Sequence, residues 1–200
     1  AYTPQLFVEE LEGVMRCLNA GSLRCVIGHS LGGILAVAYS ASRPRPIERL
    51  ALFATPFPVD SATNYRRFLR SPMKRLMVHH RLLGRLTHKV GCRLFPLLLR
   101  AVRGGRYPRE ILQDFHKHTH HSYTDTAERC LFRFDVRPWL GAVPDLSAFL
   151  TYSDIDREVP VADAEQYATT LRGSHCHIVH REHELVPFGS EMQLREWLHR

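Results

Sequence analysis

The sequence has no long apolar run, no paired cysteine motif and no internal repeat. None of its 200 residues belongs to a stretch of about eighteen apolar side chains, which argues against a membrane-spanning helix. The five cysteines are odd in number, widely spaced and without a C-x-x-C pair. We therefore expect neither a disulfide framework nor a zinc site, but reduced thiols in a cytoplasmic protein. The 44% hydrophobic content is typical of one globular domain.

Acidic residues are nearly absent from one part of the chain. Residues 61–110 contain thirteen Lys or Arg and one acid, so the rest of the chain carries about −5 of the total charge of +7. Three interpretations are open: a solvated basic helix face, a lid that favours anionic substrates or anionic membrane surfaces, and a nucleic-acid surface. Leucines between 82 and 98 interleave with Arg85, Lys89 and Arg93, which is typical of the second. No nucleic-acid-binding motif accompanies the charge, so we predict no nucleic-acid partner.

A cluster of four histidines raises the question of a metal site. It consists of His116, His118, His120 and His121. His116 and His120 have helical i, i+4 spacing, but no acid or cysteine is spaced as a third ligand. We interpret the cluster as the solvated face of a helix and predict no metal.

The most informative stretch is the hexapeptide Gly28-His29-Ser30-Leu31-Gly32-Gly33. It follows a short apolar run at 23–27, which predicts a buried strand. It precedes small and aliphatic residues at 31–40, which predict a helix. A serine at such a strand-to-helix turn is typical of a nucleophile elbow, which exposes the serine hydroxyl for acyl chemistry.

Each glycine of this elbow has an expected purpose. Gly28 and Gly32, two residues before and after Ser30, must be small because larger side chains would collide across the turn. Gly33 lets the following helix lie close to the strand. The N–H of Leu31 is the expected first donor of an oxyanion hole at the helix N-terminus.

A serine nucleophile needs a base, and the base needs an acid that orients it. A predicted strand at 146–152 is followed by Asp154 and Asp156, and the last predicted strand, at 176–179, is followed by His180 and His183. Groups that face a ligand in an open α/β sheet lie at the carboxyl ends of its strands. Both aspartates are therefore candidate acids and both histidines are candidate bases.

At this point the chain resembles the C-terminal two-thirds of an α/β-hydrolase. The residues at 28–33 match the family's elbow, and the sequence DREVP, which begins at Asp156, resembles its D-x-x-V-P acid loop. His183, 27 residues later and just before the final helix, occupies the place of the family's histidine. The resemblance favours Asp156 over Asp154 and His183 over His180.

The resemblance implies an α/β fold with a mostly parallel sheet flanked by helices. The core comprises 1–55 and 145–200, and a helical cap or lid comprises 56–144. From the residue patterns we predict a further strand at 47–55, and core helices at 4–18, 31–40, 161–171 and 191–198. Ser190 and Gln193 predict a capping box for the last of these. Cap helices are expected at 65–85, 86–102, 109–120 and 124–134.

The family also has strands before the helix at 4–18, and a His-Gly pair that marks the second oxyanion donor. No His-Gly pair occurs in this sequence. We therefore expect the chain to be an N-terminally incomplete hydrolase, and the strand before Ser30 to be an unprotected sheet edge.

By this resemblance Ser30 attacks an acyl carbonyl, His183 takes its proton and later returns it, and Asp156 fixes the imidazole tautomer. The predicted function is a serine hydrolase that cleaves a carboxylic ester or related acyl bond of a small molecule, anionic or lipid-like, without metal or organic cofactor. An acyltransferase and a non-catalytic or inactive truncated module are the alternatives.

Overall fold

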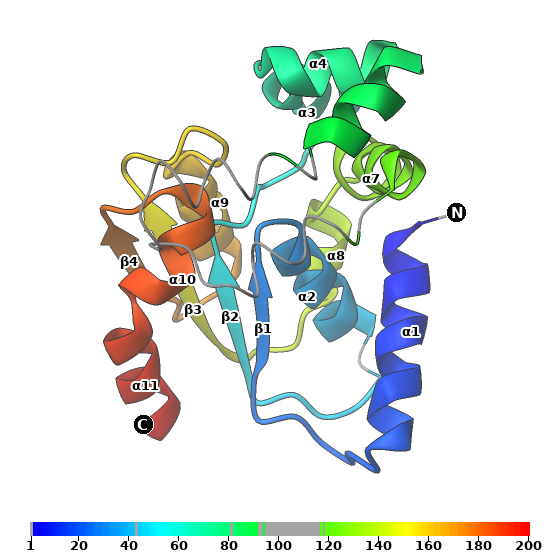
Figure 1. Ribbon diagram of the computed structural model, residues 1–200. Helices are drawn as coiled ribbons and strands as arrows, with labels where there is room; N and C mark the ends of the chain where they lie inside the picture. Colours follow the sequence, from blue (N-terminus) through cyan, green and yellow to red (C-terminus); the bar gives the residue numbers. More distant parts are fainter. Residues whose placement is uncertain (1, 43, 81, 92–93, 95–116, 118) are drawn as a thin grey trace.

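The computed structural model describes residues 2–42, 44–80, 82–91, 94, 117 and 119–200 (Figure 1). Most of the predicted helices at 86–102 and 109–120 lies outside these residues, as do His116 and His118. No helix in the described ranges is both long enough and apolar enough to cross a membrane.

Four parallel strands form one sheet in the order β1-β2-β3-β4. They are β1 (Val26–His29), β2 (Arg49–Phe53), β3 (Ser147–Ser153) and β4 (His175–Val179). The predicted α/β class and parallel sheet are confirmed, and each predicted strand exists with its ends shifted by a few residues. Within the described residues β1 is an edge strand, and its Ile27 side chain is exposed.

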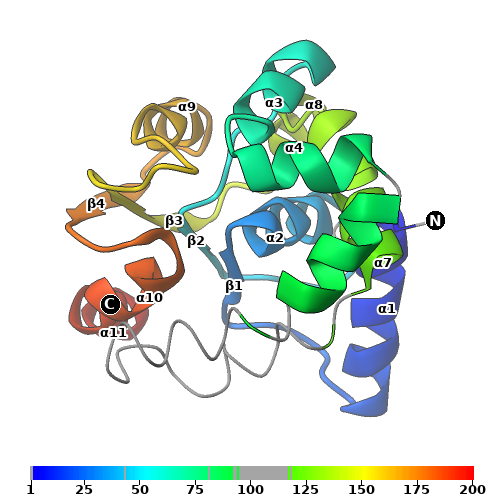
Figure 2. The same cartoon turned by 45° about the horizontal axis from the view of Figure 1, so that its top comes forward.

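Both faces of the sheet are covered, which explains why the central strands are apolar on both sides. Every residue of β2 except Arg49, and every residue of β3 except Ser147, is buried. One face packs against α1 (Pro4–Cys17), α2 (Leu31–Ser42), α8 (Arg137–Ala142) and α9 (Ala162–Thr170). The other face packs against α10 (Val186–Gly189) and α11 (Glu191–His199) (Figure 2).

Of the two helix caps predicted from the sequence, at Thr3 and Ser190, the structure has only the first. Thr3 caps α1 by accepting a hydrogen bond from the Leu6 N–H at 3.2 Å, with Pro4 in the first turn, as predicted. The capping box at Ser190 is wrong. Ser190 follows α10 directly with ψ of 20°, and its Oγ is buried without a hydrogen-bond partner in the described structure. Its backbone, with φ of −127°, is neither helical nor in the extended conformation that a capping serine needs.

The helices between 56 and 144 lie mainly beyond the carboxyl ends of the strands (Figure 1). Besides α8, they are α3 (Ser61–Phe68), α4 (Pro72–His79), a helix at 82–91 and α7 (His120–Ala127), which continues into a π-helical turn (Glu128–Phe132). The single helix predicted at 65–85 is wrong, because Ser71 caps a new helix at Pro72 and the backbone is extended again at His80. The short helix α8 was not predicted.

One buried ion pair links this segment to the core. The Arg67 guanidinium of α3 donates to both carboxylate oxygens of Asp163 on α9, at 2.6 and 3.1 Å. Asp163 is buried and also accepts the Phe57 N–H at 2.9 Å. Burial raises the pKa of this carboxyl, although its hydrogen bonds with Phe57 and Arg67 oppose that effect. The carboxylate therefore depends on Arg67 for compensation of its charge.

We predict that Arg67→Met lowers the free energy of unfolding by about 3 kcal/mol, because it leaves the Asp163 carboxylate buried and unpaired. Arg137→Met is the matched control. Arg137 is paired with Asp135 at 2.6 Å but is mostly exposed, so its loss should cost less than about 1 kcal/mol. Urea unfolding of both variants measures the difference. Adding Asp163→Asn to Arg67→Met should recover part of the loss, and equal small losses for the two single variants would contradict this assignment.

Candidate active site

Ser30 has a strained backbone at the turn between β1 and α2. Its φ is 52°, in the left-handed region that non-glycine residues rarely adopt. The turn is held because the Ser30 N–H donates to the Phe53 carbonyl at 2.8 Å, and the Ser30 carbonyl accepts the Gly33 N–H at 2.9 Å. Strain of this kind costs about 1–3 kcal/mol and is concentrated at functional sites in proteins.

Two glycines make the turn possible by allowing close contacts. A Cβ on Gly28 would lie 2.4 Å from the Gly32 carbonyl oxygen, and a Cβ on Gly33 would lie 1.9 Å from Thr55 Oγ1. The predicted collision at Gly32 is wrong, because a Cβ there would have nothing within 4 Å. The steric constraint falls on position 28, where a side chain would collide with the backbone of Gly32. Gly33 allows the helix to pack closely, as predicted, but the helix packs there against Thr55, which follows β2.

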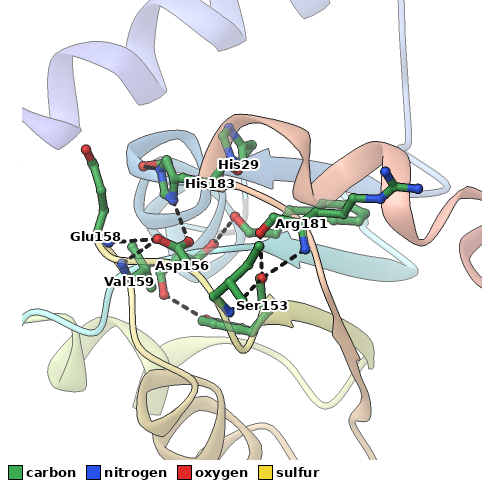
Figure 3. Close-up of polar contacts among 12 residues, drawn as sticks. His29, Ser153, Asp156, Glu158, Val159, Arg181 and His183 are labelled. Carbon is green, nitrogen blue, oxygen red and sulfur yellow. Dashed lines mark hydrogen bonds and ion pairs between the residues drawn. The ribbon is translucent and has the colours of Figure 1, made fainter. Parts of the chain in front are cut away.

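The structure brings Ser30, Asp156 and His183 together at the carboxyl ends of β1, β3 and β4. The Nε2 atom of His183 lies 2.9 Å from Ser30 Oγ, and its Nδ1 atom lies 2.7 Å from Asp156 Oδ2. Figure 3 shows the His183 ring beside the Asp156 carboxylate. The Asp156 side chain is fully buried, and that of His183 is 11% exposed. One imidazole thus connects a serine hydroxyl to a buried carboxylate.

The second oxygen of Asp156 is held by the backbone of its own loop. Asp156 Oδ1 accepts the N–H groups of Glu158 at 2.7 Å and Val159 at 3.0 Å. Burial alone would raise the pKa of Asp156, but the hydrogen bond and charge of His183, together with these N–H groups, lower it below its ordinary value. Asp156 is therefore ionised at neutral pH and both of its oxygens are oriented.

The contact between Asp156 and His183 raises the pKa of the histidine, whereas it lowers that of the aspartate. Burial alone would lower the pKa of this imidazole, but the hydrogen bond and charge of Asp156 outweigh it and raise the pKa above the ordinary value of 6.5. Because the Asp156 carboxylate only accepts, the Nδ1 atom of His183 carries a proton. In the neutral imidazole the Nε2 atom then has its lone pair free for the Ser30 hydroxyl.

The two alternative candidates pair with each other instead. His180 Nδ1 lies 2.9 Å from Asp154 Oδ1, and both side chains are more than half exposed to solvent. This second pair lies at the ends of the same two strands, but outside the buried site. The structure thus places Asp156 and His183, which the family resemblance favoured, beside Ser30, and it places Asp154 and His180 outside that contact.

Two further residues position the histidine loop, and sequence reasoning gave neither of them this role. Ser153, at the end of β3, donates through Oγ to the Arg181 carbonyl at 2.5 Å and accepts the Arg181 N–H at 3.2 Å (Figure 3). His29 Nε2 lies 2.9 Å from the His183 carbonyl oxygen, which only accepts, so Nε2 carries a hydrogen. Burial, followed by the nearby charge of His183, lowers the pKa of His29 to about 4. His29 is thus a neutral donor at neutral pH.

The start of α2 faces the same turn. Leu31, directly after Ser30, is the first residue of this helix, and the first N–H groups of a helix have no partner within it. These groups and the positive end of the helix dipole can stabilise an oxyanion formed at Ser30. Among the described residues, no three His, Cys, Asp or Glu side chains are arranged to hold a metal ion.

Comparison with known proteins agrees with this architecture. A family model described as "Alpha/beta hydrolase family" matches residues 2–188. Among solved structures, an esterase from Exiguobacterium antarcticum has 15% sequence identity and a TM-score of 0.68, covering 100% of this chain and 75% of that one. A hydrolase from Pseudomonas aeruginosa PA01 has 17% identity and a TM-score of 0.67, covering 98% and 70%.

An enol-lactonase from Burkholderia xenovorans LB400 also shares the fold. It has 17% identity and a TM-score of 0.64, with coverage of 98% of this chain and 70% of that one. No curated protein sequence matches this chain. At such identities the solved structures show a common fold only.

We predict that Gly28→Ala and Gly32→Ala differ sharply in stability, although they lie on either side of the same serine. A Cβ at position 28 overlaps backbone atoms, and such overpacking costs about 1–3 kcal/mol. A Cβ at position 32 meets open space inside a helix, where alanine is favoured over glycine by up to about 1 kcal/mol. Thermal unfolding of both variants measures the contrast, and equal effects would contradict the described geometry of the turn.

Proposed function

This chain belongs to the alpha/beta hydrolase family, and we propose that it is a serine hydrolase acting on a carboxylic ester or related acyl bond. The observation that carries the proposal is the position of the His183 imidazole, 2.9 Å from Ser30 Oγ and 2.7 Å from Asp156 Oδ2. Distances of this size allow direct proton transfer from the serine hydroxyl to the imidazole.

The proposed reaction begins when His183 Nε2 takes the Ser30 hydroxyl proton and Ser30 Oγ bonds to the acyl carbon. The carbonyl oxygen becomes an oxyanion beside the Leu31 N–H, and the Asp156 carboxylate stabilises the imidazolium. The bond to the leaving alcohol then breaks, and His183 gives that alcohol the proton. A water molecule, deprotonated by the same imidazole, then attacks the acyl carbon. The bond from that carbon to Ser30 Oγ breaks, the carboxylic acid leaves, and His183 returns the proton to Ser30.

An ester or lactone substrate agrees with the fold neighbours, which include an esterase and an enol-lactonase. We also propose that residues 56–144 act as a cap over the substrate. The α4 helix reaches the acid loop, where Lys74 Nζ lies 2.7 Å from Glu158 Oε2, two residues after Asp156. Figure 2 shows α3 and α4 on the side of the sheet covered by α2. The basic composition of this segment favours an anionic or lipid-like acyl compound.

We predict that a fluorophosphonate probe labels the purified chain, and that it hydrolyses a water-soluble ester such as p-nitrophenyl acetate. Ser30→Ala should abolish labelling and lower kcat/KM by more than about 10³-fold. Asp156→Asn should lower kcat by about three to four orders of magnitude, because the amide stabilises the wrong tautomer. The matched control is Asp154→Asn, which changes the exposed pair at the end of the same strand and should leave both measurements unchanged.

Other outcomes would replace the proposal. Labelling with turnover only when an alcohol or thiol is added indicates an acyltransferase on the same site. Labelling that persists in Ser30→Ala contradicts the assignment of the nucleophile. A correctly folded chain that neither reacts with the probe nor hydrolyses a panel of esters indicates a non-catalytic module.

A further inference from the structure

The helix at 82–91 exposes large apolar side chains to solvent. The exposed fractions are 81% for Leu82, 52% for Leu83, 60% for Leu86 and 45% for Val90. Single exposed apolar residues are common on protein surfaces, but a group of them on one helix indicates an interaction surface. We call these four residues the leucine face.

The leucine face lies opposite the side by which the helix packs on the protein. At about 100° per residue, its four members fall within an arc of about 100°. The buried residues Gly84 and His88 fall on the other side of the helix. The His88 ring lies 5.7 Å from that of Tyr123 and 6.1 Å from that of His120, both on α7. This amphipathic helix therefore has its polar and small residues inward and its leucines outward, the reverse of an ordinary surface helix.

Basic residues border the leucine face, and acids are absent around it in sequence. Arg85 and Lys89 are exposed and lie along one edge of the four apolar side chains. Between residues 61 and 109 the sequence contains no Asp or Glu. Arg67 and Lys74, which belong to the same basic segment, have carboxylate partners between residues 145 and 200. Arg85 and Lys89 lie on the exposed side of the helix.

We propose that the leucine face docks on an anionic lipid surface. The leucines can insert at the boundary of the lipid acyl chains, while Arg and Lys bind the anionic phosphates of the headgroups. Helices with this pattern lie in the plane of the membrane interface. A second copy of the chain is a poorer partner, because pairing two such faces would bring Arg85 and Lys89 of both copies together. Leu97, Leu98 and Arg93, which the sequence pattern also included, lie outside the described residues.

Flotation with large unilamellar vesicles tests this proposal without any need for enzymatic activity. One set consists of phosphatidylcholine, and the other of phosphatidylcholine and phosphatidylglycerol in equal parts. We expect the chain to float with the mixed vesicles and not with the neutral ones. Raising the salt to about 1 M shortens the Debye length from about 10 Å to about 3 Å and should release most of it.

Three double variants separate the contributions. Leu82→Ser with Leu86→Ser should weaken partitioning by more than about tenfold, since each buried methylene contributes to membrane affinity. Arg85→Gln with Lys89→Gln should weaken it by about tenfold or more and remove the salt dependence. The matched control is Val14→Ser with Leu18→Ser, which changes one side chain of α1 and one directly after it. These side chains are 52% and 67% exposed, and their loss should change partitioning less than about twofold.

Circular dichroism melts of each variant confirm that it is folded. Absence of flotation, equal flotation with neutral vesicles, or an equal loss in the α1 control would overturn the proposal. A concentration-dependent dimer that disappears in the Leu82→Ser, Leu86→Ser variant, with no vesicle binding, would assign the leucine face to a second copy of the chain. Stable capture of a protein partner through this face, again without vesicle binding, would likewise replace lipid by protein.

Discussion

The candidate site depends on one shared imidazole, because His183 can serve Ser30 only while Asp156 holds its other nitrogen. The three residues come from the ends of three different strands, so their distances are fixed by the pairing of β1 with β2, β2 with β3, and β3 with β4. Two further contacts bring the histidine loop to that point: Ser153 binds the backbone at Arg181, and His29 donates to the carbonyl of His183 itself. One residue that positions the His183 loop, His29, is therefore the direct neighbour of Ser30, the proposed nucleophile.

The elbow is also where the fold accepts backbone strain. Ser30 lies in the left-handed region, and its hydroxyl is directed at the imidazole only because the backbone turns there. The close approach of Gly28 to Gly32, and of Gly33 to Thr55, fixes this conformation. The Phe53 carbonyl, at the end of the neighbouring strand, accepts the Ser30 N–H and ties the turn to the buried centre of the sheet. Strain at Ser30, the proposed nucleophile, is thus offset by packing in a rigid region.

Much of this arrangement could be predicted from the sequence, because the local patterns around the elbow and the core strands are strong. The choice between Asp154 and Asp156, or between His180 and His183, could not be made from residue types alone. Both pairs lie in the same two loops, and which one faces Ser30 depends on how those loops turn in three dimensions. The contact of Ser153 with Arg181 was not predictable for the same reason, since no sequence pattern distinguishes this serine from others at strand ends. The predicted collision at Gly32 and the predicted capping box at Ser190 were wrong because the conformation of the backbone, which residue type does not reveal, decides both.

The contact of Asp156 with His183 fixes the tautomer of the imidazole and raises its pKa. A ¹⁵N NMR titration of the histidine rings measures both quantities directly. We expect neutral His183 to carry its proton on Nδ1, and its pKa to lie above 6.5 and to fall in Asp156→Asn. Because only the neutral ring can accept the Ser30 proton, ester hydrolysis should rise with pH through the same pKa. A proton on Nε2 in the neutral ring, or a pKa of His183 that Asp156→Asn leaves unchanged, would contradict this role of Asp156.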